Sequence, residues 1–342
     1  MLNKKADIIA VAKAARVSPS TVSRSFNHPE LVKAATRKRI DRAVRKLGYI
    51  RNRAAQTIHG IRSGTLGLVV PTIDHAIFAE LVQSFSEAVE ELGFTILLAS
   101  HGYNLDREYA LTRKMLEHRV DGLALVGLQH AEETFALVQQ QSIPTILLWN
   151  YARQTPLPCV GSDNYQAGYL IGQHVAQAGH RDIAAVFPPL DGNDRAERRF
   201  AGATDALSAA GITIAKDWLL ETPYSVTAAK EAVGQLLSVP QKPSAILCGN
   251  DVLAWGAMHA CARAGLTVPR DVAVTGIGDF KGSRDFEPPL TTVRIPARQI
   301  GQRAAVAMAQ AIVTPDAPAN SELIAPELLV RASSIPEDFP RL

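Results

Sequence analysis

The first fifty residues carry apolar positions with the spacing of short helices. Asp7 is suited to cap a helix that runs to about Ala15, and Ser18 followed by Pro19 marks the start of a second helix. Apolar residues at i, i+3, i+4 and i+7 predict a third helix, which ends at a glycine; they are Ile40, Ala43, Val44 and Leu47, before Gly48. Three short helices with a tight turn between the first two indicate a helix-turn-helix domain.

From Thr65 onward, apolar strands alternate with amphipathic helices. The predicted strands are 66–71, 94–100, 122–126, 145–149, 183–187, 245–249 and 272–277. The predicted helices are 77–92, 106–118, 131–141, 164–178, 194–210, 225–238, 251–264 and 296–311, and residues 288–293 are expected to cross between lobes. This alternation implies buried parallel sheets with right-handed crossovers. So many strands fit an α/β fold of two doubly wound lobes better than one lobe.

The second predicted helix has two different faces. Val22 and Phe26 point to one side, whereas Ser20, Arg24 and Asn27 point to the other. The outward face is short, polar and cationic, as a helix must be to lie against base edges and phosphates. A solvated surface helix has the same pattern, so this stretch alone leaves both interpretations open.

Charge separates the start of the chain from the rest. Residues 1–63 hold fifteen Lys and Arg against three acidic residues, a net charge of +12, whereas the remaining chain holds 21 basic and 30 acidic residues, a net charge of −9. Such asymmetry indicates a polyanionic partner for the basic segment, and nucleic acid is the leading candidate. Residues 50–60 form a basic connector, which is either a plain linker or a short helix that forms only on DNA.

The composition is that of an ordinary globular protein with two or three domains. Of the 342 residues, 47% are hydrophobic and 20% are charged. No secretion signal and no run of ~18 apolar residues is visible, so a cytoplasmic location is expected. The three cysteines lie far apart without a CxxC pair, and we expect no disulfide, metal site or cofactor; they are Cys159, Cys248 and Cys261.

No motif in the sequence supports catalysis. Residues 276–282 resemble a dinucleotide-binding fingerprint, but the third glycine is one residue late and no helix follows. P-loop, HExxH and GxSxG motifs are absent, so no enzyme is expected. Residues 194–202 are more informative, because three arginines at a helix start oppose the macrodipole. Either Asp194 and Glu197 neutralise these arginines locally, or one or two of them face a ligand.

Six motifs together resemble the lactose-repressor (LacI/GalR) family of transcription regulators, over residues 6–335. They are VSPSTVSR at 17–24, LGYIRNRAA at 47–55, VDGL at 120–123, GHR at 179–181, GND at 249–251 and PLTTV at 289–293. Within the family, residues 77–80 and 101–103 are most similar to repressors of the gluconate-operon type.

The resemblance implies a modular chain that binds pseudo-palindromic operator DNA as a homodimer. A helix-turn-helix domain is expected over 1–50, a hinge helix and linker over 51–63, an effector-binding domain over 64–335 and a tail over 336–342. The effector-binding domain would consist of two lobes like those of periplasmic sugar-binding proteins. The first lobe is expected at about 64–162 plus 294–322, and the second at about 163–293 plus 323–335.

The resemblance also assigns DNA-contacting positions. Ser20 and Arg24 match base-reading positions, and Ile58 stands where a leucine usually wedges into a base step. The remaining DNA-contacting positions are Ser18, Thr21, Ser23, Asn27, Asn52 and Ala55. Arg16 and Lys33 stand where the family usually has a turn glycine and a serine cap, so the local geometry is expected to differ there.

Between the lobes, the resemblance implies an effector site. Its residues would be Ile77, Phe78, Trp149, Asn193, Arg195, Arg199, Tyr224 and Asn250, with Asp279 as a nearby candidate. Trp149 and Gly278 stand where sugar-binding members often have aspartates. A site with fewer acids and with two arginines favours a sugar acid or a sugar phosphate. If Asp194, Glu197 and Asp279 cancel the arginines, a neutral sugar is expected instead.

Sequence and resemblance together predict a cytoplasmic, homodimeric repressor of a carbohydrate-related operon, controlled by a small effector. The first alternative is a solute-binding receptor module without DNA function, against which the basic N-terminal segment argues. The second is a Rossmann-type enzyme, which the missing phosphate loop disfavours.

Overall fold

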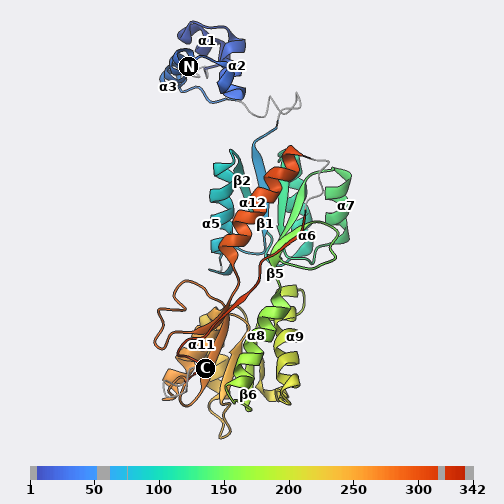
Figure 1. Cartoon of the computed structure of the whole chain (residues 1–342), viewed down its shortest axis with the longest axis vertical. Helices are drawn as coiled ribbons and strands as arrows, with labels where there is room; N and C mark the ends of the chain where they lie inside the picture. Colours follow the sequence, from blue (N-terminus) through green and yellow to red (C-terminus); the bar gives the residue numbers. More distant parts are fainter. Residues whose placement is uncertain (1–5, 52–61, 75, 315–319, 336–342) are drawn as a thin grey trace. The chain divides into compact units, whose positions relative to one another are not determined.

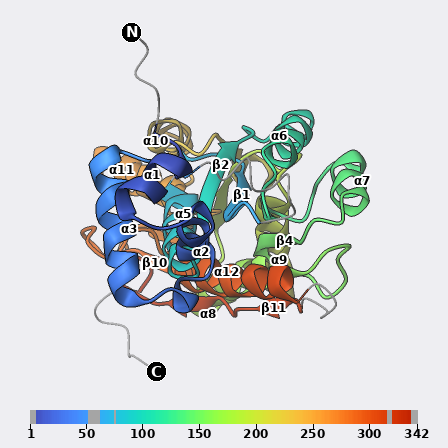
Figure 2. The ribbon, with the colours of Figure 1, turned by 90° about the horizontal axis from the view of Figure 1, so that it is seen from above.

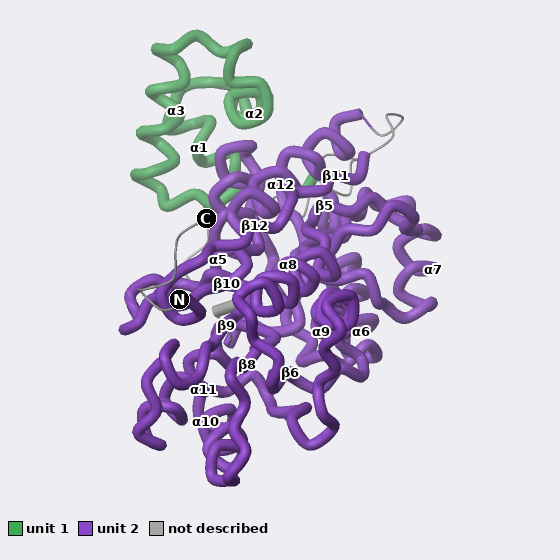
Figure 3. Tube along the Cα trace, turned by 60° about the horizontal axis from the view of Figure 1, so that its bottom comes forward, with its two compact units in different colours: residues 1–63 green, residues 64–342 purple. Residues whose placement is uncertain are grey.

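The computed structural model describes residues 6–51, 62–74, 76–314 and 320–335. The chain forms two compact units, residues 1–63 and 64–342, shown in green and purple in Figure 3. Each unit has its own hydrophobic core. Residues 52–61 of the expected hinge and the tail expected at 336–342 lie outside the described residues.

The described part of the first unit packs three α-helices around a small core. Asp7 caps the first helix by accepting a hydrogen bond from the Ala10 N–H at 2.8 Å, and Gly48 ends the last helix with a φ of 59°. The predicted helix-turn-helix domain is therefore confirmed. Its elements are α1 (Ile8–Ala15), α2 (Pro19–Asn27), the 3-10 turn η1 (Pro29–Leu31) and α3 (Ala34–Leu47).

The first lobe of the second unit is a six-stranded parallel sheet with the order β2-β1-β3-β4-β5-β11. The strands are β1 (Thr65–Val70), β2 (Thr95–Ser100), β3 (Gly122–Val126), β4 (Thr145–Asn150), β5 (Cys159–Ser162) and β11 (Glu322–Leu323). The helices are α5 (Ala76–Glu91), α6 (Leu105–Glu117), α7 (Glu132–Gln140) and α12 (Ala297–Val313).

Alternate residues of these strands face different helices. Leu66 and Leu68 pack into the core with α5 and α12, whereas Leu123 and Leu125 pack with α6 and α7. Figure 1 shows α12 beside α5, although more than 200 residues separate them in the sequence, and Figure 2 shows α6 and α7 away from that pair. A parallel sheet covered on both faces explains why the strands are almost continuously apolar.

The second lobe repeats this plan with the order β7-β6-β8-β9-β10-β12, in which only the β10–β12 pair is antiparallel. One face packs against α8 and α9, and the other against α10 and α11. The strands are β6 (Ile183–Phe187), β7 (Leu219–Glu221), β8 (Ala245–Cys248), β9 (Ala273–Gly278), β10 (Thr291–Arg294) and β12 (Glu327–Leu329). The helices are α8 (Asn164–Gln177), α9 (Asp194–Ala209), α10 (Val226–Leu236) and α11 (Asp251–Arg263), with the 3-10 turn η2 (Lys216–Trp218).

The chain passes between the lobes after β5, β10 and β11. The crossing segment predicted at 288–293 is wrong in part, because Thr291–Arg294 forms β10 and the crossing follows it. The sequence pattern also missed β5, β7, β11 and β12, since strands of two to four residues are too short to show a period.

Candidate functional site

The helix α2 begins with the predicted serine cap. Ser18 Oγ accepts a hydrogen bond from the Thr21 N–H at 3.2 Å and lies 2.8 Å from the hydroxyls of Ser20 and Thr21. In the turn before α2, Arg16 has a φ of 56°, so it adopts the left-handed conformation that glycine occupies without strain. At the start of α3, Lys33 provides no side-chain cap.

The exposed side of α2 is polar. Ser20 and Arg24 are exposed and Val22 is buried, while Thr21 and Ser23 are partly covered. Phe26 packs against the core of the unit, as its spacing from Val22 predicts. The exposed side of α2 is therefore short and polar, and its own guanidinium group is that of Arg24.

Asn27 differs from its neighbours because its side chain is already engaged. Its Nδ2 donates to Ser23 Oγ at 3.4 Å, and its Oδ1 accepts from the guanidinium of Arg51. The predicted contacts Asn52, Ala55 and Ile58 lie outside the described residues. All the DNA-contacting roles stay predictions.

A second cluster lies between the lobes, where the parallel strands end. Trp149 in β4 has a φ of 79°, and its ring meets the ring of Phe78 edge to face at 5.3 Å. The guanidinium of Arg195, from α9 of the second lobe, lies 5.8 Å from the centre of the Phe78 ring. Ligands of open α/β sheets bind at this end of the strands, so the cluster is the candidate effector site.

Asp194 joins the two lobes through hydrogen bonds. Its Oδ2 accepts from the Leu128 N–H at 2.9 Å and from Asn150 Nδ2 at 2.6 Å. Its Oδ1 lies 3.0 Å from Arg195 Nη1. Of the two readings left open by the sequence, local neutralisation therefore applies to Arg195.

Arg199 is in a different situation. Its side chain is fully buried, its Nε donates to Asn164 Oδ1 at 2.7 Å, and its Nη1 donates to the Gly249 carbonyl at 3.1 Å. Both partners are neutral, and burial lowers the pKa of Arg199 to about 10. Its Nη2 has no hydrogen-bond partner among the described residues. Arg199 makes no ion pair with the described residues, and a buried cation in this situation is suited to bind an anion.

Two further buried donors belong to predicted site residues. Asn250 uses its Oδ1 to accept from the Leu253 N–H at 3.0 Å, which caps α11, while its Nδ2 makes no hydrogen bond with the described residues. The same holds for Trp149 Nε1. Buried donors are normally satisfied, so these atoms indicate where acceptor atoms of a ligand belong.

The remaining predicted residues are placed as follows. Asn193 caps α9, accepting from the Ala196 N–H at 3.4 Å, and its Nδ2 donates to the hydroxyl of Tyr224 at 3.2 Å. Ile77 belongs to α5, and its side chain lies outside the described part of the structure.

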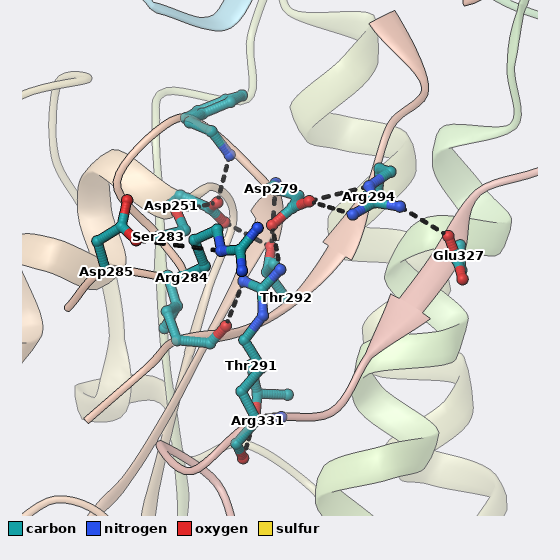
Figure 4. A network of polar contacts seen from close by, with 12 residues as sticks. Asp251, Asp279, Ser283, Arg284, Asp285, Thr291, Thr292, Arg294, Glu327 and Arg331 are labelled. Carbon is teal, nitrogen blue, oxygen red and sulfur yellow. Dashed lines mark hydrogen bonds and ion pairs between the residues drawn. The ribbon is translucent and has the colours of Figure 1, made fainter. Parts of the chain in front are cut away.

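Asp279 has both carboxylate oxygens occupied. Its Oδ2 accepts from Arg294 Nε at 2.9 Å and lies 2.8 Å from Arg294 Nη2, while its Oδ1 accepts from Arg331 Nη2 at 2.5 Å (Figure 4). Arg294 also contacts Glu327 at 3.1 Å. Asp279 thus holds two segments of the second sheet together, and a role toward the effector stays a prediction.

Sequence reasoning missed Tyr103, which belongs to the same cluster. Its ring lies 5.7 Å from the Arg195 guanidinium, so Arg195 contacts the rings of both Phe78 and Tyr103. Tyr103 has a φ of 60°, and burial raises its pKa to about 12. Its position just after β2, at the edge where ligands bind, was the available signal.

The first lobe also contains a buried network that the sequence did not reveal. Glu108 Oε1 is 2.9 Å from His130 Nδ1, and Glu108 Oε2 is 3.6 Å from His101 Nε2. The other ring nitrogen of His130 lies 3.1 Å from the Gly127 carbonyl, one residue before Leu128. The network therefore supports the loop whose N–H donates to Asp194.

No helix within the described residues is long and apolar enough to cross a membrane. Among the same residues, no group of His, Cys, Asp and Glu side chains is arranged to hold a metal ion.

Two family models match the chain. "Bacterial regulatory proteins, lacI family" matches residues 7–52, and "Periplasmic binding proteins and sugar binding domain of LacI family" matches residues 63–332.

Individual relatives agree with these matches. The HTH-type transcriptional repressor PurR of Photorhabdus laumondii is 30% identical over 98% of each chain. The crystal structure of the lac repressor dimer bound to operator and the anti-inducer ONPF superposes with a TM-score of 0.86, at 26% identity over 97% of this chain and 100% of that one. The complex of the transcriptional regulator CelR with cellobiose has a TM-score of 0.71, at 26% identity over 96% and 100% of the two chains. The chain therefore belongs to the LacI family of bacterial DNA-binding transcription regulators.

Proposed function

We propose that the effector of this regulator is a small hydroxylated anion, a sugar acid or a sugar phosphate. The observation that carries the proposal is Arg199, a fully buried guanidinium whose protein partners are an amide oxygen and a carbonyl oxygen. Charge-assisted hydrogen bonds to a carboxylate or phosphate would satisfy both its charge and its remaining donor.

The neighbouring donors favour the same ligand class. Trp149 Nε1 and Asn250 Nδ2 are buried donors that a ligand rich in oxygen acceptors would satisfy. The rings of Phe78 and Trp149 would cover its apolar face. The positive charge of Arg195 contributes less to attracting an anion, because Asp194 Oδ1 lies 3.0 Å from Arg195 Nη1 and offsets it.

A neutral sugar is the second candidate. The related CelR structure holds cellobiose, a sugar without charge, and Asp194 lies close enough to offset Arg195. A neutral ligand would leave Arg199 without a direct ion pair, so we favour the anion.

Calorimetric titration with D-gluconate and D-glucose tests the choice. We expect gluconate to bind and Arg199→Ala to abolish its binding. Arg198→Ala is the matched control, because Arg198 is exposed on the same helix and packs over Tyr165 at 5.0 Å. Binding of glucose with an affinity equal to that of gluconate would contradict the charge argument and leave the regulator assignment intact.

We further propose that the protein represses a carbohydrate-related operon in the cytoplasm as a homodimer, and acts as a binding protein rather than an enzyme. Similarity to repressors and to a repressor dimer on operator DNA supports this. Ser20 and Arg24 would read bases, and the remaining α2 positions would hold the backbone. A particular closeness to gluconate-operon repressors stays a prediction. Sedimentation of residues 62–342 tests the dimer, which we expect to persist at micromolar concentration.

The division into domains over 1–50, 51–63, 64–335 and 336–342 is likewise a proposal. The two compact units and the ranges of the two family models support it. Limited proteolysis should cut first within 51–63, where the sequence places the linker.

A further inference from the structure

The positive charge of the first unit is concentrated on α3, which does not carry the predicted base-reading residues. Within α2, Arg24 is the one basic residue, whereas α3 has six basic residues and one acid, Asp41. All six are exposed; they are Arg37, Lys38, Arg39, Arg42, Arg45 and Lys46.

Four of these cations line the side of α3 that faces away from the core. Ile40 and Ala43 are buried against α1 and α2. With 3.6 residues per turn, positions 38, 42 and 45 lie on the opposite side, and position 46 follows 42 by one turn. We call Lys38, Arg42, Arg45 and Lys46 the α3 stripe.

One acid, Asp41, lies on the same side of α3 as the stripe. Among the described residues, none of its four side chains takes part in an ion pair. Lys38 and Arg42, like Arg42 and Lys46, are like charges at i and i+4, an arrangement that destabilises a helix. The helix dipole favours Arg45 and Lys46 in the last turn, but it offers nothing to Lys38. Four cations against one acid on one face, without an ion pair, point to an anionic partner.

We propose that the α3 stripe binds the phosphate backbone of duplex DNA, as a second contact surface separate from the base-reading face of α2. The proposal rests on the DNA-binding function of the family and goes beyond the contacts assigned to α2. Long, exposed Lys and Arg side chains suit contacts that ignore base sequence, because every phosphate offers the same charge. The α3 stripe would raise the affinity for duplex DNA of any sequence, and α2 would discriminate between base sequences.

The test uses the full chain and a fluorescent 30-base-pair duplex of random sequence, with binding measured by anisotropy over a range of KCl concentrations. The variant is K38Q/R42Q/R45Q, since Gln keeps a high helix propensity. The slope of log K against log[KCl] is negative, and each lost phosphate contact should reduce its magnitude by about 0.9. The variant loses three cations, so we expect the magnitude to fall by about 2–3 for each helix-turn-helix domain that is bound to the duplex. Affinity at low salt should fall at least about tenfold.

Two controls separate a contact from a general effect of charge. K114Q/K216Q/K242Q removes three exposed lysines from the second unit, and the slope should stay close to that of the wild type. K38R/R42K/R45K keeps the charges and should keep the wild-type slope. Circular dichroism verifies that α3 remains folded.

An unchanged slope in K38Q/R42Q/R45Q would overturn the proposal, and so would an equal fall in the lysine control. A stripe that instead serves an acidic protein would leave the DNA slope unchanged. If the wild-type protein bound no duplex at all, the DNA-binding function itself would be contradicted. That result differs from one in which the wild type binds DNA and the α3 stripe makes no contribution.

Discussion

The side-chain amide of Asn150 donates to the carboxylate of Asp194 at 2.6 Å, although the two residues belong to different lobes. The same carboxylate oxygen accepts from the Leu128 N–H at 2.9 Å, so one side chain of α9 holds two segments of the first lobe. Because these bonds join protein groups of both lobes directly, they favour approach of the lobes.

Asp194→Ala should loosen this connection. The change removes three interactions and leaves the buried guanidinium of Arg195 without its acid, so we expect the free energy of unfolding to fall by about 2–3 kcal/mol. Urea denaturation measures the loss, and small-angle scattering should report a larger radius of gyration. Glu197→Ala, an exposed acid of the same helix, is the control and should change neither quantity.

Arg24→Ala should reduce the preference for operator over random DNA. A bidentate contact with guanine contributes about 1–3 kcal/mol of discrimination, and Arg24 is the basic side chain of α2. Competition binding with both DNAs at a fixed salt concentration measures the change. A variant with undiminished preference would show that other residues read the sequence.

Glu108→Ala should destabilise the first lobe more than Glu108→Gln. The Gly127 carbonyl can only accept, so His130 Nε2 donates to it and His130 Nδ1 faces Glu108. Alanine would leave that buried nitrogen without a partner beside a new cavity, at a cost of about 2–4 kcal/mol. Glutamine keeps the volume and a hydrogen bond, and should cost about 1 kcal/mol. Equal losses in urea denaturation would contradict this role.

Stability should fall as the pH falls below the ordinary pKa of histidine, 6.5. Burial lowers the pKa of His174, whose Nε2 lies 2.8 Å from Ser334 Oγ. Below pH 6.5 the unfolded chain therefore takes up a proton that the folded protein binds more weakly, which favours unfolding. His174→Gln removes this titration, so the difference in denaturation midpoint between pH 7.5 and pH 5.5 should narrow. An unchanged difference would exclude His174 as a contributor.

Gly168→Ala should disturb the site through the packing of α8 on α9. A Cβ at Gly168 would lie 1.9 Å from the carbonyl oxygen of Arg199, so the helices must separate. We expect a loss of at least about 1–3 kcal/mol in the free energy of unfolding, together with weaker effector binding in calorimetry. Gly234→Ala is the control, because no atom lies within 4 Å of its added Cβ, and it should be neutral or slightly stabilising.

Long periodic segments made most of the fold predictable. The helix predicted at 194–210 is observed as Asp194–Ala209, and the strand predicted at 183–187 is observed as Ile183–Phe187. The first helices were equally clear, because Ser18 and Gly48 mark a beginning and an end by their backbone chemistry.

The site was less predictable because its properties depend on neighbours that are distant in sequence. Arg195 and Arg199 lie one turn apart on the same helix, and no local pattern distinguishes them. Only the fold brings Phe78 to Arg195 and the Gly249 carbonyl to Arg199. The sequence did not indicate Tyr103 as a site residue, because a single loop residue at positive φ produces no periodic pattern.

The burial of Arg199 has a consequence for the lifetime of the protein in the cell. A buried guanidinium that makes no ion pair makes the free protein less stable than the same fold with that ion pair formed. An anionic effector that binds only the folded chain raises stability by mass action. Since proteases remove the unfolded fraction, the amount of regulator should rise when the metabolite is abundant. Abundance of the metabolite would then set how many copies of its sensor survive.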